Sequence, residues 1–332
     1  MYSILNTDTE NCNYKIMKIR YYIAIMLFMT PLMTFPQENV KISSDTKILK
    51  DVHYNKYSQT TFDLYLPALK MGKMPLVVFF HGGSFIHGDK SEIEDQIPLI
   101  SSLLEKGIAF ASVNYRYRVD NDSLGVMRCI EDATDFIRFI RFHAETYCID
   151  SEHIGCYGES AGAGISLFIA FHEDMAVPSS QNPLFRESTR IQCVGAIITQ
   201  STYNLFRWKK ILPGFRLIYL LKKKTLNNQI ANFYGFSSYK SFKPFKKEIT
   251  EKLDMLKMIT SDDPPVWLCN IKTKEYKRGI PHNETQMFHH PRHAEVVGKE
   301  AERNGVVNFV ITSEKEKNQV PALDDFFERY IK

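Results

Sequence analysis

The sequence predicts an α/β protein in which a central, mostly parallel β-sheet is flanked by helices on both faces. Short apolar runs typical of strands recur along the chain, and segments with helical periodicity separate several of them. Several of these runs are continuously apolar, as in strands that are covered on both faces. With 332 residues, of which 44% are hydrophobic, the chain can bury a sizeable core.

Seven segments have strand character. Residues 60–66 alternate between polar and apolar side chains, whereas 76–80 and 108–113 are nearly continuous apolar runs. The other candidate strands cover residues 153–157, 194–199, 266–271 and 307–311. Apolar residues spaced three or four apart predict helices at 126–147, 161–172, 293–303 and 322–331. Ligands of such sheets bind beyond the carboxyl ends of the strands, so residues that follow a strand are the candidates for a site.

Composition excludes several classes of protein. Charged residues make up 24% of the chain, which argues against disorder and against a membrane bundle, and the net charge of +4 does not indicate a nucleic-acid binder. Six cysteines do not make a disulfide scaffold. Cys156, Cys193 and Cys269 lie in or beside predicted strands, so we expect buried free thiols there. No metal or organic cofactor is implied, and the oligomeric state cannot be inferred from the sequence.

The first 37 residues form a separate N-terminal extension. A basic start at Met17-Lys18-Ile19-Arg20, an apolar run over 21–35 and a polar exit predict a signal peptide at about 17–37. We therefore expect an exported protein, periplasmic or extracellular. The apolar run is short for a membrane span. An uncleaved N-terminal anchor is the alternative, and membrane contact is expected only through that segment.

One motif has the pattern of a nucleophile elbow. Gly158-Glu159-Ser160-Ala161-Gly162 follows a predicted strand and opens a predicted helix. Glycines two positions before and after the serine allow a turn that is too tight for larger side chains. The hydroxyl of Ser160 would then be exposed above the sheet, at a helix N-terminus that favours an anion. An ordinary helix cap is the competing interpretation.

A second motif, His81-Gly82-Gly83-Ser84-Phe85, follows the strand at 76–80 directly. Adjacent glycines at this edge allow backbone N–H groups to turn toward a ligand. Attack of a serine on an ester builds negative charge on the carbonyl oxygen, and donors aimed at that oxygen are a large catalytic contribution. The N–H groups of Gly82, Gly83 and Ala161 are therefore the candidates for an oxyanion hole.

With these motifs the chain resembles the α/β-hydrolase fold. The branch is that of the His-Gly-Gly carboxylesterases and lipases, hormone-sensitive-lipase-like or feruloyl/acetyl-xylan-esterase-like. Residues 113–117 (VNYRY) and 262–265 (DDPP) also fit, and the resemblance extends from about Thr60 to the C-terminus. It implies that Ser160 is the nucleophile, that the glycines beside His81 form the oxyanion hole, and that His81 shapes this loop and is not the base.

The chain departs from that family where the base and the acid are expected. The family places a histidine after the strand at 307–311, yet none of the ten histidines lies in the final 39 residues. We take His290 as the first candidate for a displaced base and Glu275, after the strand at 266–271, as the candidate acid. A triad is defined by geometry and not by chain order. The other candidate bases are His87, His282, His289 and His293.

An inserted segment separates two core strands. Residues 203–248 hold eleven Lys or Arg, one acid and eleven aromatics, so their net charge is +10. We expect one domain over 38–332 with a cap insertion at about 203–258. The predicted function is a serine carboxylester hydrolase acting on acylated carbohydrate or small acyl esters. The alternatives are a degenerate hydrolase that only binds such a ligand and a serine peptidase of the same fold.

Overall fold

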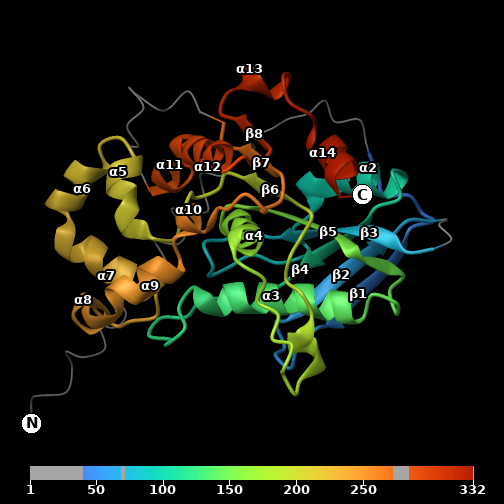
Figure 1. Cartoon of the computed structure of the whole chain (residues 1–332), viewed down its shortest axis with the longest axis horizontal. Coiled ribbons are helices and arrows are strands. Elements are labelled where there is room, and N and C mark those ends of the chain that lie inside the picture. The colour runs from blue at the N-terminus through green and yellow to red at the C-terminus, as the bar shows by residue number, and fades with distance from the viewer. Residues whose placement is uncertain (1–39, 69–71, 272–283, 332) are drawn as a thin grey trace, which may run out of the picture. The chain divides into compact units, whose positions relative to one another are not determined.

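The computed structural model describes residues 40–68, 72–271 and 284–331, and its centre is one sheet of eight strands (Figure 1). The strands are β1 (Lys47–His53), β2 (Thr61–Leu66), β3 (Met74–Phe80), β4 (Ala109–Val113), β5 (Ile149–Glu159), β6 (Cys193–Ile197), β7 (Val266–Cys269) and β8 (Asn308–Ile311). Their order across the sheet is β1-β2-β4-β3-β5-β6-β7-β8. The pairs β1–β2 and β2–β4 are antiparallel, and all other pairs are parallel. The predicted mostly parallel sheet is confirmed.

Helices cover both faces of the sheet, and alternate residues of each strand supply the two cores. Along β3, Leu76 and Val78 pack into one core, while Val77 and Phe79 pack into the other. The first core also contains residues of α3 (Met127–Phe142), α4 (Ala161–Phe171) and α12 (Arg292–Arg303). The second contains residues of α2 (Ile97–Glu105) and α14 (Leu323–Tyr330). This is the layered arrangement that the sequence predicts.

The inserted segment between β6 and β7 is helical and lies to one side of the sheet (Figure 1). Its helices are α5 (Trp208–Ile211), α6 (Phe215–Leu221), α7 (Lys223–Phe233), α8 (Tyr239–Phe242), α9 (Lys246–Lys252) and α10 (Met255–Met258). Aromatic side chains form much of its interior: the rings of Tyr234 and Phe242 stack with centroids 5.1 Å apart, and Trp208 meets Phe215 at 6.3 Å. We refer to residues 203–258 as the cap.

Two short helices lie near the C-terminal strands, α11 (Glu284–Phe288) and α13 (Glu314–Lys317), and short 3₁₀ turns lie at Glu94–Gln96, Pro183–Arg186, Leu205–Arg207 and Lys243–Phe245. Lys41–Lys332 forms one compact unit that contains every element described. Cys156, Cys193 and Cys269 are buried free thiols, as predicted. In the parts of the chain that the structure describes, no helix has the length and apolar character that crossing a membrane requires. The predicted signal peptide lies outside the described residues.

Candidate active site

Ser160 lies on a sharp turn between β5 and α4. Its backbone has φ 50° and ψ −108°, a left-handed φ that non-glycine residues adopt rarely and that is found preferentially at functional sites. The backbone N–H of Ser160 donates to the carbonyl of Ile197 at the end of β6, which fixes the turn at the carboxyl edge of the sheet. The side chain is partly exposed. The turn is therefore the one that the motif predicts.

The glycines on either side of Ser160 are required by close backbone contacts. A Cβ at Gly162 would lie 1.9 Å from the carbonyl oxygen of Phe80, and one at Gly158 would lie 2.4 Å from the carbonyl carbon of Gly162. Real Cβ atoms essentially never approach backbone so closely. The start of α4 can thus pack directly on the end of β3 only because both positions lack a side chain.

The glycine loop after β3 runs beside this turn. A Cβ at Gly82 would lie 3.7 Å from the Cβ of Ser160. Gly83, Ser84 and Phe85 all have left-handed φ values, of 103°, 53° and 67°. In the described part of the chain, the backbone N–H groups of Gly82, Gly83 and Ala161 donate no hydrogen bond to another residue. Three unpaired donors next to a serine hydroxyl are the arrangement that an oxyanion needs.

His81 holds the glycine loop in shape. Its buried ring stacks on Tyr115 with centroids 4.4 Å apart, and its Nδ1 lies 2.7 Å from the carbonyl oxygen of Gly82. The hydroxyl of Tyr115 donates to the carbonyl of His81 at 2.8 Å. Burial lowers the pKa of the His81 ring below its ordinary value, so the ring is neutral at pH 7. These contacts match the loop-shaping role that the family resemblance implies.

The histidine that reaches Ser160 is His289. Its Nε2 lies 2.8 Å from Ser160 Oγ, within hydrogen-bond range for a nucleophile and its base. His289 follows α11, and its backbone N–H donates to the carbonyl of Thr285 at 3.0 Å, which closes the last turn of that helix. The imidazole beside Ser160 thus comes from the segment between β7 and α12, and not from the loop after β8.

The sequence analysis chose His290 as the first candidate base, but the adjacent residue, His289, is the one that lies beside Ser160. His290 is buried, and its Nδ1 accepts the backbone N–H of Arg292 at the start of α12. Adjacent residues at a helix end point in different directions, so only one of the pair can face Ser160. His87 is exposed and makes no described contact with Ser160. Glu275 and His282 lie outside the described residues, and the assignment of Glu275 as the acid stays a prediction.

Two buried polar side chains fix the backbone around His289: Asn270, which the sequence analysis did not single out, and His293, which it considered only as a candidate base. Asn270 directly follows β7; its Nδ2 donates to the carbonyl oxygen of Thr199 at 2.9 Å and, more distantly, to those of His289 and His290. His293 in α12 is fully buried. Its Nε2 lies 3.1 Å from the carbonyl oxygen of Met287, and its Nδ1 accepts the Ser201 backbone N–H at 3.1 Å. A polar residue directly after a strand was the available signal for Asn270.

The environment of His289 keeps its ring neutral. The residue is half-buried, and burial lowers the pKa of its ring from 6.5 to about 4. The pKa of His293 is lowered further, to about 3, chiefly by burial. A neutral imidazole with a free Nε2 lone pair is the form that can accept a proton from a serine hydroxyl.

The cap contacts both halves of this site. The rings of Trp208 in α5 and Phe288 lie 5.8 Å apart, and Phe288 is the neighbour of His289. On the other side, Phe85 of the glycine loop packs against Tyr203 and Phe233 of the cap, with centroids 5.5 and 5.9 Å apart. The cap therefore packs against the segment that carries His289 and against the glycine loop after β3.

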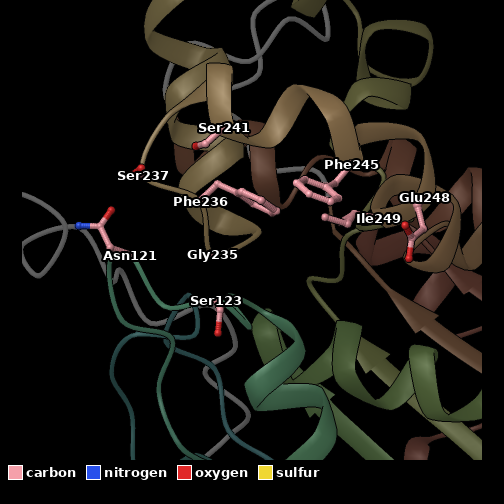
Figure 2. Close-up of a pocket in the computed structure, with 9 residues that line it drawn as sticks. All are labelled: Asn121, Ser123, Gly235, Phe236, Ser237, Ser241, Phe245, Glu248 and Ile249. Atoms are coloured by element: carbon pink, nitrogen blue, oxygen red, sulfur yellow. The ribbon is translucent and has the colours of Figure 1, made fainter.

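A separate open pocket of about 440 Å³ lies between the cap and the loop that precedes α3 (Figure 2). Figure 2 shows the rings of Phe236 and Phe245 side by side above Ser123. Its lining residues are Asn121, Ser123, Gly235, Phe236, Ser237, Ser241, Phe245, Glu248 and Ile249. Neither Ser160 nor His289 is among them, so this pocket is not the site of the serine.

The sequence profile of the BD-FAE family matches residues 62–289, a range that includes the glycine loop, the elbow and His289. The chain belongs to the BD-FAE family. The match covers more than half of the chain, and the α/β-hydrolase esterase branch expected from the two motifs is thereby confirmed. His289 is the last residue of the match, whereas the strand β8 and the loop after it lie beyond it.

The individual proteins that this chain resembles include esterases, in agreement with the family match. A probable isoprenylcysteine alpha-carbonyl methylesterase of Oryza sativa subsp. japonica is 31% identical over 156 residues, which are 47% of this chain and 35% of the plant protein. The chain thus spans about a third of that relative. Among solved structures, a truncated carbohydrate esterase from gut microbiota has a TM-score of 0.57 at 15% identity, covering 87% of this chain and 98% of that one. An acetyl ester-xyloside bifunctional hydrolase from Caldicellulosiruptor lactoaceticus has a TM-score of 0.53 at 17% identity, covering 84% and 83%. These structural likenesses show the shared fold.

Proposed function

We propose that this BD-FAE family member is an active serine carboxylester hydrolase with Ser160 as nucleophile and His289 as general base. The observation that carries the proposal is the 2.8 Å approach of Ser160 Oγ to His289 Nε2. Beside it lie the backbone N–H groups of Gly82, Gly83 and Ala161, which donate to no residue of the described chain. This approach argues against the degenerate hydrolase, which the empty histidine position after β8 had favoured.

In the proposed reaction, His289 takes the proton of the Ser160 hydroxyl while Oγ attacks the ester carbonyl carbon. The carbonyl oxygen becomes an oxyanion that the N–H groups of Gly82, Gly83 and Ala161 stabilise. His289 then gives its proton to the departing alkoxide, which leaves as the alcohol. Water, deprotonated by the same ring, then attacks the carbonyl carbon of the acyl-serine. The bond from this carbon to Ser160 Oγ breaks, His289 returns the proton to Oγ, and the carboxylic acid is released.

The neutral ring accepts at Nε2, so Nδ1 carries the hydrogen and needs an acceptor to orient it. We propose that Glu275 supplies that acceptor, because it follows β7 by six residues and β7 ends at the same sheet edge as Ser160. Small acyl esters and acylated carbohydrates are the proposed substrates. The names of the two structural neighbours, a carbohydrate esterase and an acetyl ester-xyloside hydrolase, support this choice. Export by the signal peptide at 17–37 is part of the same proposal.

Turnover of p-nitrophenyl acetate and of acetylated xylan by the purified protein tests the function, with Ser160→Ala as the control. We expect turnover of the first ester that Ser160→Ala abolishes, and release of acetate from the second if the substrate is a carbohydrate ester. A folded protein with no Ser160-dependent turnover of any acyl ester would contradict the proposal and favour the ligand-binding alternative. Cleavage of a peptide amide in preference to esters would favour the peptidase.

A further inference from the structure

Helix α6 of the cap carries an apolar face that the described chain leaves uncovered. Leu217, Leu220 and Leu221 are exposed by 62%, 62% and 77% of their surface. They stand three and four residues apart, so they lie on one side of the helix. Phe215 and Tyr219 are buried on the opposite side and anchor the helix in the cap. Single exposed leucines are common in folded proteins, but a cluster of three on one short helix marks an interaction surface.

Basic side chains border these leucines. Arg216 precedes Leu217, and Lys222, Lys223 and Lys224 follow Leu221 as α6 passes into α7. All four are exposed, and none of them forms a salt bridge with another residue of the described chain. Four of the eleven basic residues of 203–248 thus gather here without an ion-pair partner in the described chain.

The basic field extends inward from this surface. Lys209 Nζ lies 3.5 Å from the centroid of the Tyr219 ring on the inner side of α6. The pKa of Lys209 is lowered, first by burial and then by the nearby charges of Lys246 and Lys223. Cations crowded in this way gain stability when an external anion approaches.

Leucines and unpaired cations side by side fit one partner chemistry. Leucine side chains partition into the acyl region of a bilayer, and lysines and arginines bind anionic head groups at its surface. An anionic polysaccharide would use the cations but not the leucines, and a hydrophobic protein groove would not need the cations. Figure 1 shows α6 at the outer left of the cap, with α5 beside it on the side of the sheet.

We propose that α6 and the start of α7, residues 216–224, form a membrane-contacting surface that binds bilayers containing anionic phospholipid. The sequence analysis assigned membrane contact to the N-terminal segment alone, so this is a second and independent surface. It does not depend on the proposed esterase activity. Because Trp208 packs on both Phe215 of α6 and Phe288, the surface is joined through the cap to the segment that carries His289.

Vesicle flotation of residues 41–332, the compact unit that holds all described elements, tests the proposal without the N-terminal apolar segment. The vesicles contain phosphatidylcholine alone or phosphatidylcholine with phosphatidylserine. We expect the unit to float with the anionic vesicles and to bind the neutral ones at least tenfold more weakly, because each basic residue near such a surface is worth roughly a fivefold change in binding.

Two sets of variants separate the leucines from the charges. Replacing Leu217, Leu220 and Leu221 by Ser, or Lys222, Lys223 and Lys224 by Gln, should each lower binding to anionic vesicles about tenfold or more. Matched controls on exposed positions elsewhere, Val119, Val177 and Val307 to Ser and Lys47, Lys50 and Lys299 to Gln, should leave binding within about twofold. Ser160→Ala should float as the unchanged unit does, which keeps this test separate from that of the activity.

Thermal unfolding of every variant verifies that it is folded. All the replaced side chains are exposed, so we expect no variant to lose the fold. Absence of flotation with any vesicle by the folded unit would overturn the proposal. Equal losses in the control variants would also overturn it, because the binding would then be a property of overall charge or apolarity. A leucine variant that converts a dimer to a monomer without changing flotation would assign α6 to contact with a second copy.

Discussion

Replacement of His289 is the perturbation that separates the displaced base most cleanly from its neighbours. His289→Ala removes the acceptor 2.8 Å from Ser160 Oγ and leaves the hydroxyl protonated and weakly nucleophilic. Loss of a triad base costs up to about 10⁶ in kcat, or roughly 8 kcal/mol in the barrier, and leaves about 10³–10⁴ over the uncatalysed rate from the oxyanion donors. We therefore expect kcat for p-nitrophenyl acetate to fall by about 10⁴–10⁶.

The adjacent histidine supplies the matched control. His290 Nδ1 accepts the backbone N–H of Arg292, so His290→Asn retains an acceptor at the start of α12 and should cost about 1 kcal/mol of stability or less. Its kcat should stay within about tenfold of the parent, since a helix-start contact carries no reacting proton. Steady-state kinetics of both variants, with circular dichroism to verify folding, make the comparison. The reasoning is refuted if the His290 variant loses activity and the His289 variant keeps it.

Four further outcomes follow from the contacts of the site. Burial lowers the pKa of His289 to about 4, so kcat/KM should stay constant as pH falls from 7 and should decline only well below pH 6.5. A decline of kcat/KM centred at pH 6.5 or above would contradict a buried base. His289 and His293 are neutral in the fold but protonate in the unfolded chain below about 6.5, so stability should fall as pH drops from 6.5 toward 4, by about 2 kcal/mol for each ring at pH 5 in urea unfolding. Gly162→Ala places a Cβ 1.9 Å from a backbone oxygen and should lower the free energy of unfolding by about 3 kcal/mol or more. The control Gly155→Ala should lower it clearly less, because the nearest atoms to its Cβ would be side-chain atoms at 3.0–3.2 Å. Equal losses of stability would show that the turn tolerates a methyl group. Asn270→Ala should lower the free energy of unfolding by about 1–3 kcal/mol, because it leaves the buried backbone of Thr199 unpaired. It should also lower kcat, because Asn270 donates to the His289 backbone. Unchanged unfolding and kinetics would contradict this positioning role.

The sequence predicts the sheet well because its strands are marked by local apolar runs. The edge strand β1 was missed for a physical reason: most of it is exposed, and a register shift between Leu49 and Val52 breaks its alternation. Helix α2 was missed as well. The long strand β5 was recognised only at its apolar end, because its first half is mostly exposed or half-buried.

The elbow and the glycine loop could be predicted because their chemistry requires glycine at fixed spacing. The sequence does not distinguish His289 from His290 as the residue that faces Ser160. The two are adjacent, and only the direction of the chain after α11 decides which ring lies beside the serine. The partners of Asn270 and His293 could not be predicted, because Asn270 donates to Thr199 and His293 accepts from Ser201, both distant in the sequence.

Covalent labelling with a fluorophosphonate probe tests the pairing of Ser160 with His289 most directly. The probe reacts only with an activated serine, and peptide mass spectrometry locates the adduct. We expect rapid labelling at Ser160 in the parent protein and in His290→Asn, labelling slowed by several orders of magnitude in His289→Ala, and none in Ser160→Ala. Labelling of Ser160 at an unchanged rate in the folded His289→Ala protein would contradict the account.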